Sequence, residues 1–221
     1  MQCINLGSIE TRYSELSSSI LRTPTTKLSS PVLRDLIKKS EIYLKLECFQ
    51  HSGTFKARGA LSVTKQIIKE NKKFGITAAS AGNHAIAAAW AAKVEKLSAK
   101  VVMQTSANPY RISLAKTYGA EIIMKEGGLA AFAEADRLMR EENRTFIHPF
   151  DGIDTTLGSA GVGLELIEDY SDLDAVVVAV GGGGLISGVA AAVKLKNNKC
   201  KIYGVEPIGA NSMAQSIKAG K

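Results

Sequence analysis

Short apolar runs alternate with longer stretches of helical periodicity along most of this chain. The apolar runs predict strands at residues 42–46, 74–79, 101–104, 121–124, 145–148, 174–180 and 201–206. Between them lie predicted helices, one reaching to about residue 71 and others at 83–96, 109–119, 129–142, from a glycine run to about 197, and from 211. Strands that alternate with helices require right-handed crossovers and give largely parallel sheets. The pattern therefore predicts an α/β fold.

Three local signals sharpen this assignment. Pro109 suits the first turn of a helix because its backbone angle is already helical, and Gly119 is a typical residue at a helix end. The run 174–180 is apolar without alternation, as expected for a parallel strand that is buried on both faces.

Composition limits the class of protein. The chain has 221 residues, of which 45% are hydrophobic, enough for one or two domains with their own cores. No apolar run approaches the length of a membrane span, and residues 1–13 lack the layout of an export signal. Cys3, Cys48 and Cys200 are odd in number and widely scattered, which argues against a disulfide framework and predicts a cytoplasmic location.

The net charge of +7 does not indicate nucleic-acid binding. The basic residues are spread along the chain, and aromatic residues make up only 6% of it, whereas a nucleic-acid interface needs a concentrated basic face with stacking rings. We interpret the charge as solvated surface that draws anionic ligands.

Four consecutive glycines, Gly181 to Gly184, stand between a predicted buried strand and a helix. Backbone without side chains can wrap closely around an anion, with amide groups and the helix dipole facing it, so phosphate is the natural ligand. A dinucleotide fold is an alternative, with Glu206 on a ribose hydroxyl. That alternative is weak, because Ile186 or Ser187, depending on the frame, stands where the third fingerprint glycine belongs.

Two further segments carry candidate chemistry. Lys56 lies between a glycine-containing turn and the start of a helix, where its amine can project into a cleft; the alternative is an exposed lysine that opens an amphipathic helix. Asn83 follows a predicted strand at the carboxyl end, where open α/β sheets bind ligands; the alternative is an ordinary helix N-cap.

Together, segments 52–59, 80–84 and 181–184 resemble the lysine, asparagine-loop and glycine-loop motifs of the fold-type II pyridoxal-phosphate enzymes. The similarity is strongest to the branch of serine/threonine dehydratases and serine racemases, and it runs from about residue 23 to the last residue. It implies two open, largely parallel twisted sheets with flanking helices, as in the tryptophan synthase beta-like fold. It also implies pyridoxal 5'-phosphate as the cofactor and an amino acid as the substrate.

The resemblance assigns roles to residues. Lys56 becomes the Schiff-base lysine and the base that takes the Cα proton. Asn83 becomes the partner of the ring hydroxyl, and Gly181 to Gly184 become the phosphate site. Ser80, Gly82, Asn83 and His84 surround the substrate carboxylate. The implied activity is that of an L-serine/L-threonine ammonia-lyase, which removes the hydroxyl group and yields a 2-keto acid and ammonia.

The resemblance also implies a domain layout. Residues 51–148 form a small domain inserted into a large one made of 1–50 and 149–221. Relatives continue beyond the position of Lys221, with strands and a partner for the pyridine nitrogen, so the large domain is expected to be incomplete. A chain that binds the cofactor without turnover therefore stays open as an alternative. Relatives are often dimers, which makes a homodimer a further expectation.

Departures from the family pattern bear on activity. Ala81 stands where related racemases have a serine that moves a proton, which favours elimination over racemisation, although a racemase remains an alternative. Glu206 and Ala210 match part of a cation site, but Ser212 replaces its acidic ligand, so only a weak site is expected. Residues 157–161 differ from the usual Ala-Gly-Gln-Gly-Thr near the cleft.

Overall fold

The computed structural model describes residues 4–32, 40–72 and 74–220; Cys3 and Lys221 lie outside these ranges. The helices are α1 (Leu6–Leu16), α3 (Lys56–Lys69), α4 (Asn83–Val94), α5 (Pro109–Thr117), α6 (Gly127–Glu142), α7 (Ile153–Asp169), α8 (Gly184–Lys196) and α9 (Ser212–Ala219). The strands are β1 (Thr25–Lys27), β2 (Tyr43–Lys45), β3 (Ile76–Ala79), β4 (Ala99–Gln104), β5 (Glu121–Lys125), β6 (Thr145–Phe146), β7 (Ala175–Ala179) and β8 (Lys201–Val205). Short 3₁₀ helices are η1 (Glu47–Phe49), η2 (His51–Gly53) and η3 (Ile208–Ala210).

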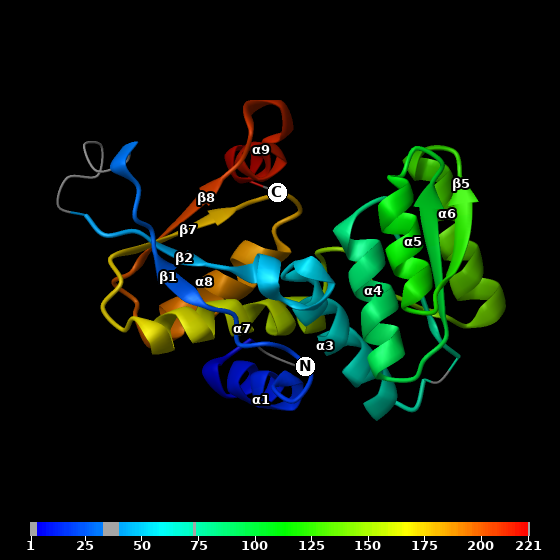
Figure 1. The fold of residues 1–221 in the computed structure, drawn as a ribbon, viewed down its shortest axis with the longest axis horizontal. Helices are drawn as coiled ribbons and strands as arrows, with labels where there is room; N and C mark the ends of the chain where they lie inside the picture. The colour runs from blue at the N-terminus through cyan, green and yellow to red at the C-terminus, as the bar shows by residue number, and fades with distance from the viewer. Residues whose placement is uncertain (1–3, 33–39, 73, 221) are drawn as a thin grey trace.

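The strands form three sheets. Four parallel strands lie in the order β5-β4-β3-β6, β7 pairs with β8 in parallel, and β1 pairs with β2 antiparallel. Figure 1 shows the four-stranded sheet with α4, α5 and α6 on one side of the molecule, the other two sheets with α1, α7 and α8 on the other side, and α3 between them. The predicted α/β class with largely parallel sheets is confirmed.

The core around the four-stranded sheet explains why the strands and helices of this region could be predicted from the sequence. All residues of β3 are buried, and most of β4 is too. Helix α4 is apolar on nearly all sides, with buried residues from His84 to Ala92, so it is enclosed between the sheet and other helices. Predicted and observed boundaries of these elements differ by three residues or fewer, as in β3 (74–79 predicted, Ile76–Ala79 observed).

Helix α7 was not predicted from the sequence, because it contains Thr155, Thr156 and three glycines that disfavour helices. Packing outweighs that propensity. A Cβ at Gly158 would lie 2.5 Å from the carbonyl oxygen of Arg58 in α3, and one at Gly163 would lie 2.7 Å from the carbonyl oxygen of Val189 in α8. The glycines let α7 approach two neighbouring helices closely.

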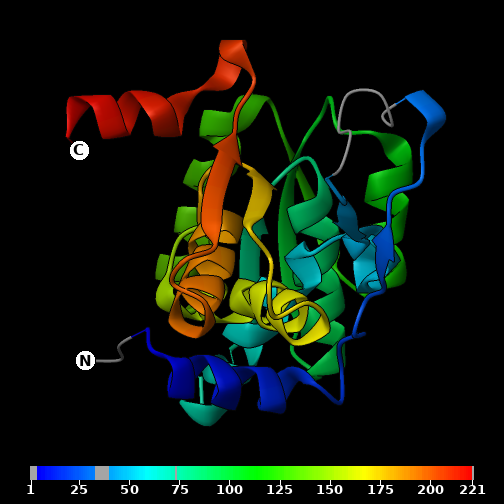
Figure 2. The ribbon, with the colours of Figure 1, turned by 90° about the vertical axis from the view of Figure 1, so that its left-hand side faces the viewer.

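Helix α1 was also not predicted. Asn5 caps it by accepting a hydrogen bond from the Ser8 amide, while the Ser8 hydroxyl is bonded to the Asn5 amide in return. Ile9, Arg12 and Leu16 are buried at helical spacing. In Figure 2 this helix runs beneath α7, and α9 projects from the end of β8.

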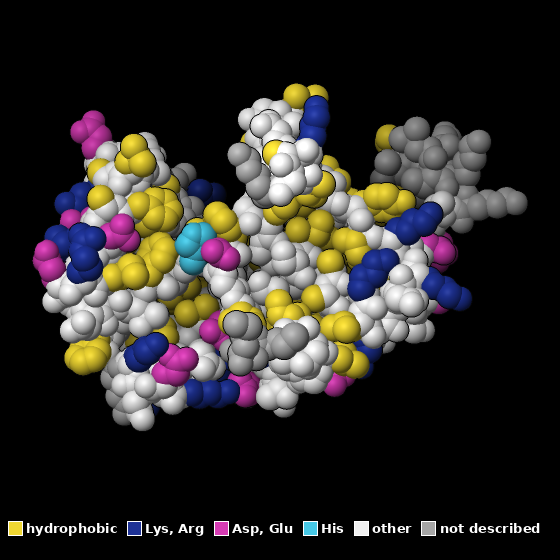
Figure 3. Space-filling model, turned by 180° about the vertical axis from the view of Figure 1, so that it is seen from behind, with side chains coloured by type: hydrophobic (Ala, Val, Ile, Leu, Met, Phe, Trp, Pro, Cys, Tyr) yellow, Lys and Arg dark blue, Asp and Glu magenta, His cyan; other side chains and the backbone are white. Residues whose placement is uncertain are grey.

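Strand β7 corrects one expectation. Only Val176 and Val178 are buried, while Ala175, Val177 and Ala179 are exposed in alternation, so the strand is not buried on both faces in the part of the chain that the structure describes. The face of the β7–β8 sheet that packs against α8 is covered, and its opposite face is exposed. Figure 3 shows hydrophobic side chains gathered near the middle of the face opposite to that of Figure 1.

No helix among the described residues has both the length and the apolar character needed to cross a membrane.

Candidate functional site

Lys56 is the first residue of α3 and follows a tight left-handed bend. Ser52 and Gly53 have φ angles of 60° and 74°, and the amide of Lys56 is bonded to the Thr54 hydroxyl oxygen at 3.3 Å. Gly53 suits this bend because it has no Cβ, whereas Ser52 adopts a backbone conformation that is uncommon for its residue type. The bend turns the chain sharply into the helix that carries the lysine.

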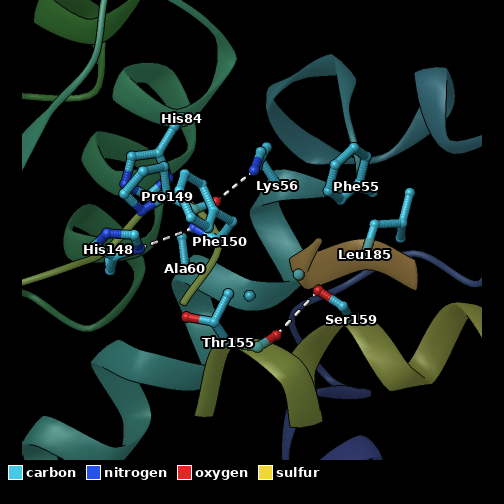
Figure 4. Close-up of a pocket in the computed structure, with 12 residues that line it drawn as sticks. Phe55, Lys56, Ala60, His84, His148, Pro149, Phe150, Thr155, Ser159 and Leu185 are labelled. Atoms are coloured by element: carbon cyan, nitrogen blue, oxygen red, sulfur yellow. Dashed lines mark hydrogen bonds between the residues drawn. The ribbon is translucent and has the colours of Figure 1, made fainter. Parts of the chain in front are cut away.

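The side chain of Lys56 reaches a small cavity rather than open solvent. Its Nζ donates a hydrogen bond to the carbonyl oxygen of Pro149 (Figure 4). Burial lowers the pKa of Lys56 below that of an ordinary lysine. A lower pKa increases the fraction of neutral, nucleophilic amine near neutral pH.

The cavity joins segments that are far apart in the sequence. Its lining residues are Phe55, Lys56, Gly59, Ala60, His84, His148, Pro149, Phe150, Thr155, Ser159, Gly184 and Leu185. They come from α3, α4, α7, the start of α8 and the loop after β6. The structure therefore brings three predicted site residues together: Lys56, His84 and Gly184.

His84 is a buried neutral histidine. Its Nε2 lies 2.8 Å from the carbonyl oxygen of Ile147, which can only accept a hydrogen bond, so Nε2 carries the proton. Burial, with a smaller contribution from Lys56, lowers the pKa of His84 to about 4. His84 is therefore uncharged at neutral pH and forms a wall of the cavity rather than a proton carrier.

The glycine loop opens α8 without a side-chain cap, so the amide groups of the first turn have no capping side chain. Gly183 has a φ of 90°, which an L-residue rarely adopts. The space around Gly181 is open, but the ring of Phe150 lies against Gly182, and the Met213 methyl group is 2.5 Å from a Cβ position at Gly183. Side-chain packing thus accounts for some of the glycines, in addition to any anion binding.

We tested whether these residues fit pyridoxal phosphate, the cofactor that the sequence motifs imply. The donor set fits, because a lysine with a lowered pKa and an uncapped helix N-terminus border one cavity. The free space between them is only about 10 Å³, roughly room for one water, because Pro149 and Phe150 lie beside Lys56 (Figure 4). Binding therefore requires Phe150 to move away from the glycine loop.

The asparagine loop lies partly apart from this cavity. Ser80 shapes the loop by accepting a hydrogen bond from the Gly82 amide at 3.1 Å, and Gly82 is the N-cap of α4. Asn83 is the first helical residue; it is exposed and borders a neighbouring cavity of about 610 Å³ together with Arg111. The contact assigned to Asn83 stays a prediction.

Glu206 caps a helix. Its two carboxylate oxygens accept hydrogen bonds from the amides of Met213 and Ala214 at 2.9 and 2.8 Å, at the start of α9. Ala210 lies in η3, and the described residues contain no cluster of histidine, cysteine and acidic side chains that could hold a metal ion. The geometry favours the capping role over the cation site.

Sequence reasoning missed residues of the loop after β6. Pro149 and Phe150 contact the predicted lysine and glycine motifs, and His148 fixes their loop because its Nδ1 accepts hydrogen bonds from the amides of Phe150 and Asp151. The available signal was their position directly after a predicted parallel strand. Ser159, within the segment that departs from the family pattern, also borders the cavity.

Comparisons with known proteins agree with the motifs. The profile of the family described as "Pyridoxal-phosphate dependent enzyme" matches residues 16–221. Phenylserine dehydratase of Ralstonia pickettii is 47% identical over 81% of this chain and 55% of its own length. L-threonine ammonia-lyase of Thermotoga maritima is 38% identical over 99% of this chain and 54% of its own.

The fold agrees as well. The solved structure of maize serine racemase matches with a TM-score of 0.92 and 34% identity, over 100% of this chain and 66% of that one. The chain spans about half the length of the two curated relatives.

Proposed function

Since the chain belongs to the family of pyridoxal-phosphate dependent enzymes, we propose that it acts as an ammonia-lyase on β-hydroxy amino acids. The proposed substrates are L-serine and L-threonine, and the products are a 2-keto acid and ammonia. The relatives named as a threonine ammonia-lyase and a phenylserine dehydratase support this reaction class.

The observation that carries the proposal is the position of Lys56. Its amine is held inside a cavity bordered by the N-terminus of α8, and burial lowers its pKa. A neutral amine can form a covalent bond with an aldehyde, and the helix N-terminus across the cavity favours an anion once Phe150 has moved aside. An exposed lysine with an ordinary pKa would not have this combination.

Pyridoxal phosphate, when bound, supplies a conjugated ring that spreads the negative charge left on a substrate after loss of a proton. The residues of this chain hold and direct the reactants. The amine of Lys56 would hold the cofactor aldehyde, and the same amine would take the proton from the substrate Cα. The backbone of Gly181 to Gly184 would hold the phosphate, and neutral His84 would form a wall of the cavity near Lys56.

Serine racemisation is a second candidate, supported by the similarity to maize serine racemase. A racemase needs a second proton carrier on the opposite side of the substrate. Ala81 has no hydroxyl group, and it packs against the apolar core next to β3. This favours elimination, and a chiral assay of serine distinguishes the two reactions.

The proposed reaction predicts release of keto acid. Purified protein with pyridoxal phosphate is expected to release a 2-keto acid from L-serine or L-threonine, with phenylserine as a third substrate, and Lys56→Ala is expected to abolish release. Release by Lys56→Ala at the wild-type rate would contradict the role of this lysine. Cofactor binding without any keto acid would instead support a chain that binds without turnover.

Further parts of the proposal concern the whole protein. We propose that residues 51–148 form a small domain between two parts of a large one, consistent with a four-stranded sheet that lies entirely within 76–146. The scattered cysteines support a cytoplasmic location. A homodimer is proposed by analogy with relatives alone.

A further inference from the structure

A buried ionic cluster includes Arg58, which is two residues after Lys56 in α3. It consists of Lys45, Glu47, Arg58 and Glu165, two positive and two negative side chains. Arg58 and Glu165 are 0% exposed, Lys45 is 6% exposed and Glu47 is 14% exposed. Charges at this depth need complete pairing, because the loss of one partner leaves an uncompensated buried charge.

Arg58 is the centre of the cluster. Its Nε and Nη2 donate to both oxygens of Glu47 at 2.8 Å, and its Nη1 and Nη2 donate to the two oxygens of Glu165 at 2.7 and 3.0 Å. Burial alone would lower the pKa of Arg58, but the hydrogen bonds with both carboxylates offset this effect and raise it. Only a planar guanidinium can serve two carboxylates in this way.

The partners of Arg58 come from segments on both sides of α3 in the sequence. Glu47 is in η1 and Glu165 is in α7, and Glu165 also accepts a hydrogen bond from the Tyr13 hydroxyl of α1 at 3.0 Å. With Lys45 of β2, which pairs with Glu165 at 2.7 Å, the cluster ties the first turn of α3 to four other elements.

The backbone at Arg58 is fixed as well. Its carbonyl oxygen lies against Gly158 of α7, where a Cβ would be only 2.5 Å away, so the two helices cross in close contact. Lys56 is two residues earlier, about 3 Å along the helix axis. Any shift of this turn moves the lysine too.

We propose that Arg58 is a positioning residue, which acts with Glu47 and Glu165 to keep the amine of Lys56 directed into the cavity. This inference rests on the proposed function, because the orientation of Lys56 matters only if its amine reacts. Displacing a reacting group by about 1 Å can lower a rate on the order of a hundredfold. The cluster prevents such a displacement.

The test measures Lys56 itself and does not require cofactor. Acetylation of Lys56 is followed against pH by peptide mass spectrometry in the wild type, Arg58→Lys and Glu47→Gln. Arg58→Lys keeps the positive charge but removes the planar guanidinium that binds two carboxylates. Glu47→Gln is a milder change, because Glu47 is the least buried residue of the cluster. The titratable groups that face the amine, His84 and His148, are unchanged in all variants.

Arg12→Lys is the matched control. Arg12 of α1 is 3% exposed; it donates hydrogen bonds to Ser62 and Gln66, farther along α3, and to Asp154 of α7. Loss of the Arg12 guanidinium is expected to destabilise the packing of α3 without changing any contact of the turn that carries Lys56.

In Arg58→Lys, and to a smaller extent in Glu47→Gln, the titration midpoint of Lys56 is expected to move up towards that of an exposed lysine. Covalent binding of pyridoxal phosphate is expected to slow by roughly tenfold to a hundredfold. Arg12→Lys is expected to lower the melting temperature and leave the midpoint unchanged.

Unchanged midpoints in both cluster variants, or an equal shift in Arg12→Lys, would overturn the positioning role. Absence of covalent binding in the wild type would refute the proposed function alone, since the acetylation result is independent of it.

Discussion

At the scale of single residues, the buried imidazole of His84 makes folding depend on pH. Its pKa is lowered from 6.5 to about 4 by burial, so between these values the unfolded chain takes up a proton that the folded chain does not. Stability contributed by neutral His84 is present above about pH 6.5 and is lost as the pH falls towards 4. The loss amounts to about 3 kcal/mol at most.

His84→Gln tests this dependence, because glutamine can donate to the Ile147 carbonyl and does not titrate. The urea midpoint of the wild type is expected to fall more steeply between pH 6.5 and 4 than that of the variant. His148, whose pKa burial also lowers, contributes equally to both proteins. Parallel curves would mean that folding does not lower the pKa of His84.

The site residues that lie next to or within glycine-containing turns were the easiest to predict from the sequence. Lys56 was predicted from the glycine-containing turn before its helix, and the glycine run from its place between a strand and a helix; the structure places Lys56 and Gly184 on one cavity. Arg58 and Glu165 were not predicted as partners, because their ionic contact joins positions 107 residues apart. Asn83 was predicted to contact the ring hydroxyl of the cofactor, a contact that stays a prediction, and the structure places Asn83 on a neighbouring cavity.

At the scale of elements, the glycines of α7 set how closely the helices pack. Gly158→Ala adds a methyl group that meets the backbone of α3, which cannot move aside as a flexible side chain can. The overpacking outweighs the higher helix propensity of alanine, and a net loss of about 1–2 kcal/mol is expected. The melting temperature should fall by roughly 2–8 °C.

Gly128→Ala in α6 is the control, because its added methyl group would be at an ordinary 3.5 Å from the Gln104 side chain. No loss of melting temperature is expected there. Equal melting temperatures of the Gly158 variant and the wild type would mean that the contact between α3 and α7 is looser than described.

Elements with a strong pattern were predicted, and elements defined by packing were not. The alternation of apolar strands and helices from β2 onwards gave nearly every element in order. Helix α7 was missed because its glycines serve contacts with α3 and α8, which a local pattern does not contain. Helix α1 could have been found from its capping pair, Asn5 and Ser8.

At the scale of the whole molecule, the arrangement of sheets explains why the site lies where it does. Helix α3 contacts both α4 and α7, and so it joins the four-stranded sheet to the elements around β7 (Figure 1). The lysine at its start therefore faces the loop after β6 and the start of α8 together. Sequence order predicted parallel sheets, but it did not predict that one face of β7 is exposed, because burial depends on what covers a sheet rather than on its own residues.

The most direct test of the proposed chemistry is reductive trapping. The protein is mixed with pyridoxal phosphate, treated with borohydride and digested, and the modified lysine is located by peptide mass spectrometry. We expect the label on Lys56 in near-stoichiometric yield, reduced by excess inorganic phosphate that competes for the glycine loop. Label spread over surface lysines, with Lys56 unmodified, would contradict the assignment of Lys56 as the cofactor-binding lysine.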